Sequence, residues 1–107
     1  MNGEQSYTRR YRGTLSYDGT AYNGFQRQRY GVPTIQAAVE AVIEQITGQA
    51  VTVSGAGRTD TGVHATGQVI AFDVEWRHDA PTLLRAMNAK LPPDIALFSL
   101  DLLPEAT

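Results

Sequence analysis

Cysteine is absent from the 107 residues, and its absence excludes disulfide bonds, thiolate metal sites and a cysteine nucleophile. Imidazole is scarce as well: the two histidines, His64 and His78, stand 14 residues apart, which argues against a zinc site. No apolar run approaches the roughly 20 residues that a membrane span requires. Residues 1–6 lack the basic and apolar regions of a secretory signal. These absences predict a soluble, cytoplasmic protein that binds no metal ion and no membrane.

The chain does contain enough apolar residues for a packed core. Of its residues 42% are hydrophobic and 19% are charged, at a length typical of one domain. The net charge of −2 is unevenly distributed, because residues 1–30 carry a net charge of +3 and residues 31–107 a net charge of −5. A basic end is compatible with a localised RNA contact, although on charge alone solvated arginines without a partner explain it better.

Patterns of apolar and polar residues predict the secondary structure. Alternation over Tyr11–Tyr17 indicates a strand, and a long loop rich in Gly, Gln and Arg follows over 18–33. Thr34 as N-cap and Gly48 as C-terminal glycine bound an amphipathic helix. The later elements are a short strand at Val51–Val53, a strand over Ile70–Trp76, a helix capped by Asp79 that buries Leu84, Met87 and Leu91, and a strand from Ile95 to Leu103.

The resulting order, β-α-β-β-α-β, predicts an α+β, ferredoxin-like fold with an antiparallel sheet and two helices on one face. The other face of the sheet is then uncovered, and we expect its Tyr, Phe and Trp side chains to need a partner or a ligand. No repeat or linker divides the chain, so residues 1–107 are interpreted as a single domain. The fold hosts many functions and decides none by itself.

The segment 54–67 carries the residues best suited to chemistry. Its four glycines let the backbone approach a ligand closely. Arg58 and Asp60 are two positions apart, so in extended backbone they lie on one side, where the guanidinium would hold the carboxylate ionised. An ionised carboxylate in a sheltered loop is a candidate nucleophile or base. A plain hairpin with a local ion pair explains the pattern equally well, and His64 alone is more often a hydrogen-bonded loop residue.

Other known motifs fit this segment poorly. It has no Gly-Lys-Ser/Thr and no helix follows, which argues against a P-loop and against a dinucleotide fingerprint. Asp60-Thr61-Gly62 matches the triplet of aspartic proteases, so a retroviral-type protease that completes its site by dimerising is a remote alternative. Those proteases are almost wholly β and place the triplet directly after an apolar strand, whereas this chain has two predicted helices and an intervening Gly57-Arg58-Thr59.

Five blocks, in order over residues 11–98, resemble the tRNA pseudouridine synthase A family. The strongest is Gly57-Arg58-Thr59-Asp60-Thr61-Gly62-Val63-His64-Ala65, which follows that family's active-site signature. The other four are Tyr17-Asp18-Gly19-Thr20, Gly24-Phe25-Gln26-Arg27-Gln28, Thr34-Ile35-Gln36, and Asn88 with Leu91-Pro92-Pro93-Asp94-Ile95.

The resemblance implies an enzyme that isomerises uridine to pseudouridine at tRNA positions 38 to 40, in the anticodon stem-loop, without a cofactor or metal. By the same resemblance Asp60 is the catalytic residue, expected as a nucleophile that attacks the sugar or the base, with removal of a ribose proton as the open alternative. Arg58 pairs with Asp60 or fills the gap left by the extruded nucleotide, because a stacked uridine must leave the helix before its glycosidic bond can be reached. The candidate RNA contacts are Arg58, His64, Gln26, Arg27 and Gln28.

Members of that family have two similar domains and form homodimers, and this sequence resembles the N-terminal domain alone. We therefore expect a fragment that has the catalytic aspartate but lacks the C-terminal domain, inactive or weakly active by itself. A non-catalytic, ferredoxin-like RNA-binding or regulatory module is the alternative. Gln68-Val69-Ile70-Ala71-Phe72 does not supply the aromatic and glycine pattern that an RNA recognition motif carries on its third strand.

Overall fold

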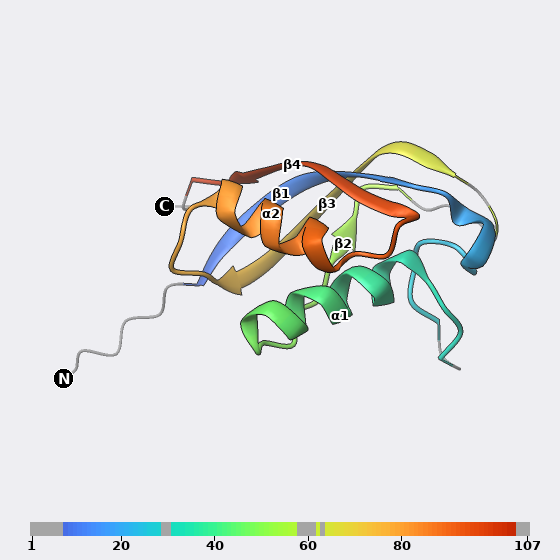
Figure 1. Ribbon diagram of the computed structural model, residues 1–107, viewed down its shortest axis with the longest axis horizontal. Coiled ribbons are helices and arrows are strands. Elements are labelled where there is room, and N and C mark those ends of the chain that lie inside the picture. Colours follow the sequence, from blue (N-terminus) through green and yellow to red (C-terminus); the bar gives the residue numbers. More distant parts are fainter. Residues whose placement is uncertain (1–7, 29–30, 58–61, 63, 105–107) are drawn as a thin grey trace.

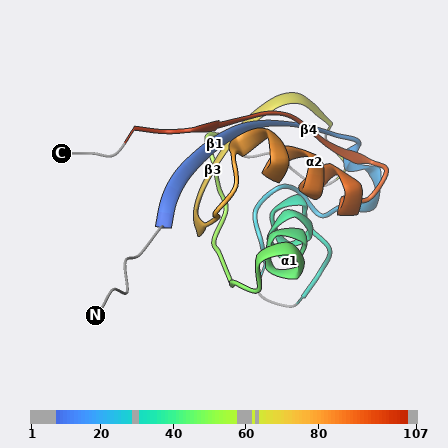
Figure 2. The ribbon, with the colours of Figure 1, turned by 60° about the vertical axis from the view of Figure 1, so that its left-hand side comes forward.

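The computed structural model describes residues 8–28, 31–57, 62 and 64–104. Its four strands form one antiparallel sheet in the order β2-β3-β1-β4, and both helices cover the same face (Figures 1 and 2). This confirms the predicted α+β, ferredoxin-like fold. In chain order the elements are β1 (Thr8–Tyr17), a 3-10 turn (Gly19–Ala21), α1 (Ile35–Thr47), β2 (Ser54–Gly55), β3 (Ala65–Glu75), α2 (Ala80–Lys90) and β4 (Ile95–Leu102).

Helix α1 begins and ends where its capping residues predict. The Thr34 hydroxyl accepts the backbone N–H of Ala37 at 3.2 Å, which satisfies one of the free donors of the first turn. At the other end Gly48 has a φ of 75°, a left-handed conformation that glycine adopts without a steric cost. Neither helix in the described part of the chain has the length and apolar composition that a membrane crossing needs.

Helix α2 begins after Asp79, whose carboxylate accepts the backbone N–H of Thr82 at 2.9 Å. Its buried residues are Leu83 and Met87, not Leu84, which is only half-buried at the edge of the core. The prediction of Leu84 was wrong by one position. Leu83, Met87 and Leu91 repeat every four residues and so form one continuous stripe toward the sheet.

The second strand is later and shorter than predicted. We expected it at Val51–Val53, but β2 is Ser54–Gly55. The backbone of Val53 bonds to side chains of α1 in place of a strand: its N–H donates to Glu40 at 2.9 Å, and its carbonyl accepts the amide of Gln36 at 2.8 Å. Strands β1 and β3 are longer than predicted, because their pairing with each other continues beyond the alternating stretches.

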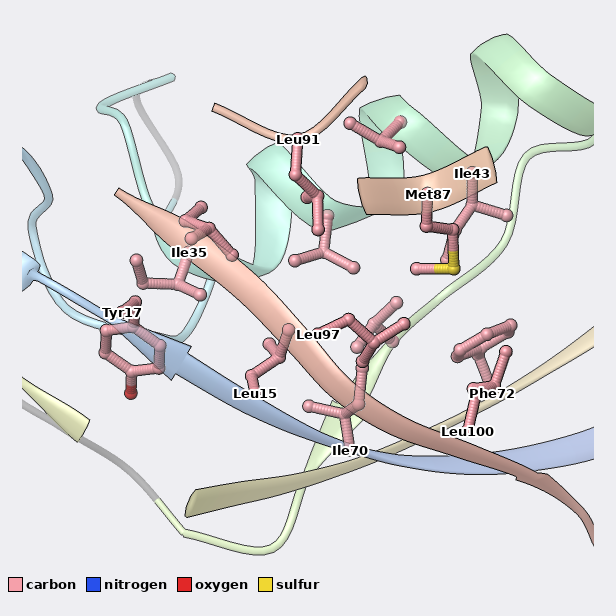
Figure 3. Packing of buried hydrophobic residues seen from close by; sticks show 14 of the residues in the cluster. Leu15, Tyr17, Ile35, Ile43, Ile70, Phe72, Met87, Leu91, Leu97 and Leu100 are labelled. Carbon is pink, nitrogen blue, oxygen red and sulfur yellow. The ribbon is translucent and has the colours of Figure 1, made fainter. Parts of the chain in front are cut away.

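The core lies between the sheet and the helices and contains most of the strand aromatics (Figure 3). Tyr11, Tyr17 and Phe72 are all buried on the helix side, so the expectation of aromatic side chains on the uncovered face was wrong for them. The alternation of β1 and β3 directs these residues toward the helices. Phe98, by contrast, is 60% exposed, and it stands without a partner at the bulge between β1 and β4. Arg10, which pairs with Asp73 across the strands, is exposed as well.

Candidate active site

The connection between β2 and β3 carries the residues predicted to act in catalysis. Arg58 and Asp60 lie outside the described residues, so their predicted roles stay predictions. Gly57 on one side of them, and Gly62 and His64 on the other, are described. The groups that contact those two ends form the described part of the site.

His64 lies directly before β3, against the first turn after β1. Its Nδ1 accepts the backbone N–H of Gly19 at 2.9 Å and lies 3.1 Å from Oδ1 of Asp18. One ring nitrogen cannot accept from Gly19 and donate to Asp18 at the same time. Because Nδ1 accepts the hydrogen bond from Gly19, the proton of the neutral ring lies on Nε2. The side chain is 61% exposed. His64 thus offers an Nε2–H donor to solvent or to a ligand.

Asp18 is held by its own turn. Its carboxylate accepts the hydroxyl of Thr20 at 2.6 Å and the backbone N–H of Thr20 at 3.0 Å. These two hydrogen bonds hold the pKa of Asp18 below its usual value. The carboxylate stays ionised at neutral pH and stabilises the turn that precedes α1.

Gly62 is bonded to the same region. Its N–H donates to the backbone carbonyl of Tyr22 at 3.2 Å, and its φ of 79° favours glycine. Tyr22 is buried, and its hydroxyl donates to Oδ1 of Asp94, in the α2–β4 turn, at 2.8 Å. Burial, and then the hydrogen bond to Asp94, raise the pKa of Tyr22 to about 12, so the phenol is a protonated donor at neutral pH. Sequence reasoning assigned no role to Tyr22, because no local pattern marks it.

The other end of the connection is bonded to β3 and lies close to the β1–α1 connection. The amide of Gln68 donates to the backbone carbonyl of Gly57. A Cβ on Gly55 would lie 2.7 Å from a ring carbon of Phe25, so this approach requires glycine. A hollow of about 280 Å³ opens here, and Gln26 is among its lining residues.

Two of the candidate RNA contacts that the structure describes, Gln26 and His64, line different hollows. Gln26 lines the hollow beside Gly57, whereas His64 lines another, of about 300 Å³, with Ser16, Asp18 and Thr66. Within the described ranges no group of three or more acidic or imidazole side chains could hold a metal ion.

Arg27 and Gln28 have partners within the protein. The guanidinium of Arg27 pairs with Glu40 at 2.5 Å, and its backbone N–H donates to Gln36 at 2.6 Å. The amide of Gln28 donates to the backbone carbonyl of Asn23 at 2.6 Å. These contacts show a structural role for both side chains and leave their contact with RNA a prediction.

Comparisons with known proteins agree on one family. The family model described as tRNA pseudouridine synthase matches residues 14–104. The tRNA pseudouridine synthase A of a Neisseria meningitidis serogroup C strain is 52% identical over 84 residues, 78% of this chain and 32% of the relative. That of Caulobacter sp. strain K31 is 51% identical over 82 residues, 77% of this chain and 32% of the relative. That of Streptococcus pneumoniae is 45% identical over 97 residues, 90% of this chain and 39% of the relative. This chain spans about a third of the length of these curated relatives.

Proposed function

The chain belongs to the tRNA pseudouridine synthase family, and from this premise we propose that it carries the catalytic aspartate of an enzyme that isomerises uridine to pseudouridine in tRNA. The observation that carries the proposal is the family match over residues 14–104, which contains the whole signature segment Gly57–Ala65. The proposed targets are the uridines at positions 38 to 40 of the anticodon stem-loop.

In the proposed reaction Asp60 is the nucleophile. The bond between uracil N1 and C1′ of the ribose breaks, the base rotates, and a bond forms between C5 and C1′. The bond from Asp60 to the substrate is released, the C5 proton leaves, and N1 gains a proton. The product has the same composition as uridine, so the chemistry requires no net oxidation or reduction and we propose no cofactor. Arg58 is proposed to pair with the Asp60 carboxylate or to fill the space left by the flipped nucleotide.

Among the proposed RNA contacts, His64 has the strongest structural support. Its ring is exposed, and the hydrogen bond from Gly19 leaves the Nε2–H as a donor for a phosphate or ribose oxygen. Gln26 comes next, because it lines the hollow beside Gly57. Arg27 shares its charge with Glu40, so we expect it to contribute less to RNA affinity than an unpaired arginine.

We propose in addition that the chain acts as the N-terminal domain of a two-domain enzyme, with the uridine bound between the domains. The support is the length of the relatives, of which 32% to 39% aligns with this chain. A homodimer of the whole enzyme and a cytoplasmic location, where tRNA is modified, belong to the same proposal.

The test uses the chain alone and a chimera in which residues 14–104 replace the matching segment of the Neisseria meningitidis relative. With tRNA tritiated at uridine C5, release of tritium reports formation of the new C5 bond. We expect release by the chimera and little by the chain alone. Asp60→Asn should lower release by at least about 10³-fold, the scale for loss of a nucleophile, with tRNA binding retained.

Asp73→Asn is the matched control, because Asp73 is an exposed carboxylate on β3. It should release tritium at the rate of the unchanged chimera. Equal release by the Asp60→Asn chimera would contradict the assignment of Asp60. Rapid release by the chain alone would contradict the two-domain part of the proposal.

A further inference from the structure

Asp94 accepts hydrogen bonds from both ends of the short turn that follows β1, Asp18 and Tyr22. Its backbone carbonyl accepts the N–H of Asp18 at 2.9 Å, and its carboxylate accepts the hydroxyl of Tyr22 at 2.8 Å. Within the turn, the N–H of Tyr22 donates to the carbonyl of Gly19 at 3.0 Å, and Asp18 caps Thr20. The turn is thus fixed to the α2–β4 connection by one main-chain and one side-chain hydrogen bond.

The same turn makes hydrogen bonds to two residues at the end of the β2–β3 connection, Gly62 and His64. The carbonyl of Tyr22 accepts the N–H of Gly62 at 3.2 Å, and the N–H of Gly19 donates to Nδ1 of His64 at 2.9 Å. One residue, Val63, stands between Gly62 and His64 in the sequence and lies outside the described residues. Gly62 and His64 therefore both have their hydrogen-bond partners, Tyr22 and Gly19, in this one turn. A displacement of the turn would move both partners together.

We propose that Tyr22 and Asp94 are positioning residues for the reaction, and that their hydrogen bond keeps the end of the signature segment in its productive place. This inference rests on the proposed function. Asp60 precedes Gly62 by two residues, and two residues of fully extended chain span at most about 7 Å. A fixed Gly62 therefore limits where the carboxylate of Asp60 can lie, without contact between Tyr22 and the substrate.

The size of the effect follows from catalytic geometry. A misplacement of about 1 Å at a reacting group can cost a factor of about 100 in rate. Loss of the phenol hydroxyl, which donates to a carboxylate, should therefore lower the catalytic rate as well as the stability of the fold. The ring of Tyr22 stays in the core in Tyr22→Phe, so the variant removes one oxygen from a buried site.

The first measurement is amide hydrogen exchange by NMR on the 107-residue chain. We expect Tyr22→Phe and Asp94→Ala to speed exchange at Gly62 and Gly19 by about tenfold, the value of roughly one hydrogen bond. Asp94→Asn keeps an acceptor oxygen for the phenol and should exchange as the unchanged chain does. Tyr11→Phe is the matched control: Tyr11 is also buried and stacks on Phe72. Tyr11 lies six residues before the end of β1 at Tyr17, a distance of about 20 Å along the strand.

The second measurement is tritium release by the chimera. Tyr22→Phe and Asp94→Ala should lower kcat by about ten- to a hundredfold with little change in KM, and Asp94→Asn should restore most of the rate. A merely structural role would lower both variants' unfolding midpoints without this separation of kcat from KM.

Equal exchange at Gly62 in Tyr22→Phe and Tyr11→Phe would overturn the inference, as would equal kcat in Asp94→Ala and Asp94→Asn. If the unchanged chimera formed no pseudouridine, the proposed function would fail on its own. The exchange rates at Gly62 and Gly19 would still support or overturn the positioning contacts.

Discussion

Replacement of Glu40 by alanine is the sharpest test of how the β1–α1 connection and β2 are held together. Glu40 lies on α1 and is 7% exposed. Its carboxylate accepts three hydrogen bonds: from the guanidinium of Arg27 at 2.5 Å, from the amide of Gln36 at 3.1 Å and from the N–H of Val53 at 2.9 Å. These partners belong to the loop before α1, to α1 itself and to the segment that leads into β2.

The magnitude follows from what each partner loses. Val53 is 0% exposed, so its N–H would be left unsatisfied in the core, at a cost of about 1–3 kcal/mol. The side chain of Arg27 is 54% exposed, and solvent screening limits the ion pair to less than about 1 kcal/mol. Gln36 keeps its second bond, to the carbonyl of Val53. We expect Glu40→Ala to lower the free energy of unfolding by about 1–4 kcal/mol in total.

The assay is equilibrium unfolding in urea, followed by far-UV circular dichroism. With a slope of about 2 kcal/mol per molar for a domain of this size, the midpoint should fall by roughly 0.5–2 M. Glu44→Ala is the matched control, because Glu44 is an exposed glutamate one turn further along α1. It should change the free energy by less than about 0.5 kcal/mol.

A second variant separates the hydrogen bond to Val53 from the charge. Glu40→Gln keeps an oxygen for the N–H of Val53 and removes the ion pair with Arg27, so we expect a loss of about 1 kcal/mol. The reasoning is refuted if Glu40→Gln is as unstable as Glu40→Ala, or if Glu40→Ala is as stable as Glu44→Ala.

Three further outcomes are expected. Asn88→Ala should lower the free energy of unfolding by about 1–3 kcal/mol in the same urea assay, because the side chain makes two hydrogen bonds of 2.9 Å to the backbone of Leu97 on edge strand β4. The Thr82 hydroxyl and backbone N–H lower the pKa of Asp79. The stability that the Asp79 carboxylate contributes is therefore complete above pH 3.8, its usual pKa, and is lost as the pH falls below that value. Urea unfolding of Asp79→Asn across this range should show a weaker acid dependence than the unchanged chain. The pKa of Tyr22 is raised to about 12, so the stability that the protonated phenol contributes is complete below pH 10.0, the usual pKa of tyrosine. This contribution is lost as the pH rises toward 12. Tyr22→Phe should remove this part of the alkaline destabilisation and the corresponding step of a spectroscopic tyrosine titration.

Features that depend on neighbouring residues were predictable from the sequence. Thr34, Gly48 and Asp79 cap their helices as predicted, because each capping contact joins residues three or four positions apart. The fold class followed as well, since the order of elements and their apolar faces leave few ways to bury the core. The family signature around Asp60 is likewise a property of the sequence.

Features that depend on distant residues were not predictable. The place of β2 was missed because Val53 bonds to Glu40 and Gln36, 13 and 17 residues away, and apolar alternation contains no sign of such partners. The aromatic residues of β1 and β3 were expected on the wrong face, because alternation shows that a strand has two faces but does not say which one the helices cover.

The sequence by itself thus determined the fold class and the chemistry proposed for the β2–β3 connection. Only the tertiary structure decided which groups hold the ends of that connection. The hydrogen bond between Tyr22 and Asp94 joins residues 72 positions apart, and that between Gly19 and His64 joins residues 45 positions apart. Such contacts form only when the sheet brings the end of β1, the start of β3 and the α2–β4 turn together at one end of its strands. No local pattern of residues encodes that approach.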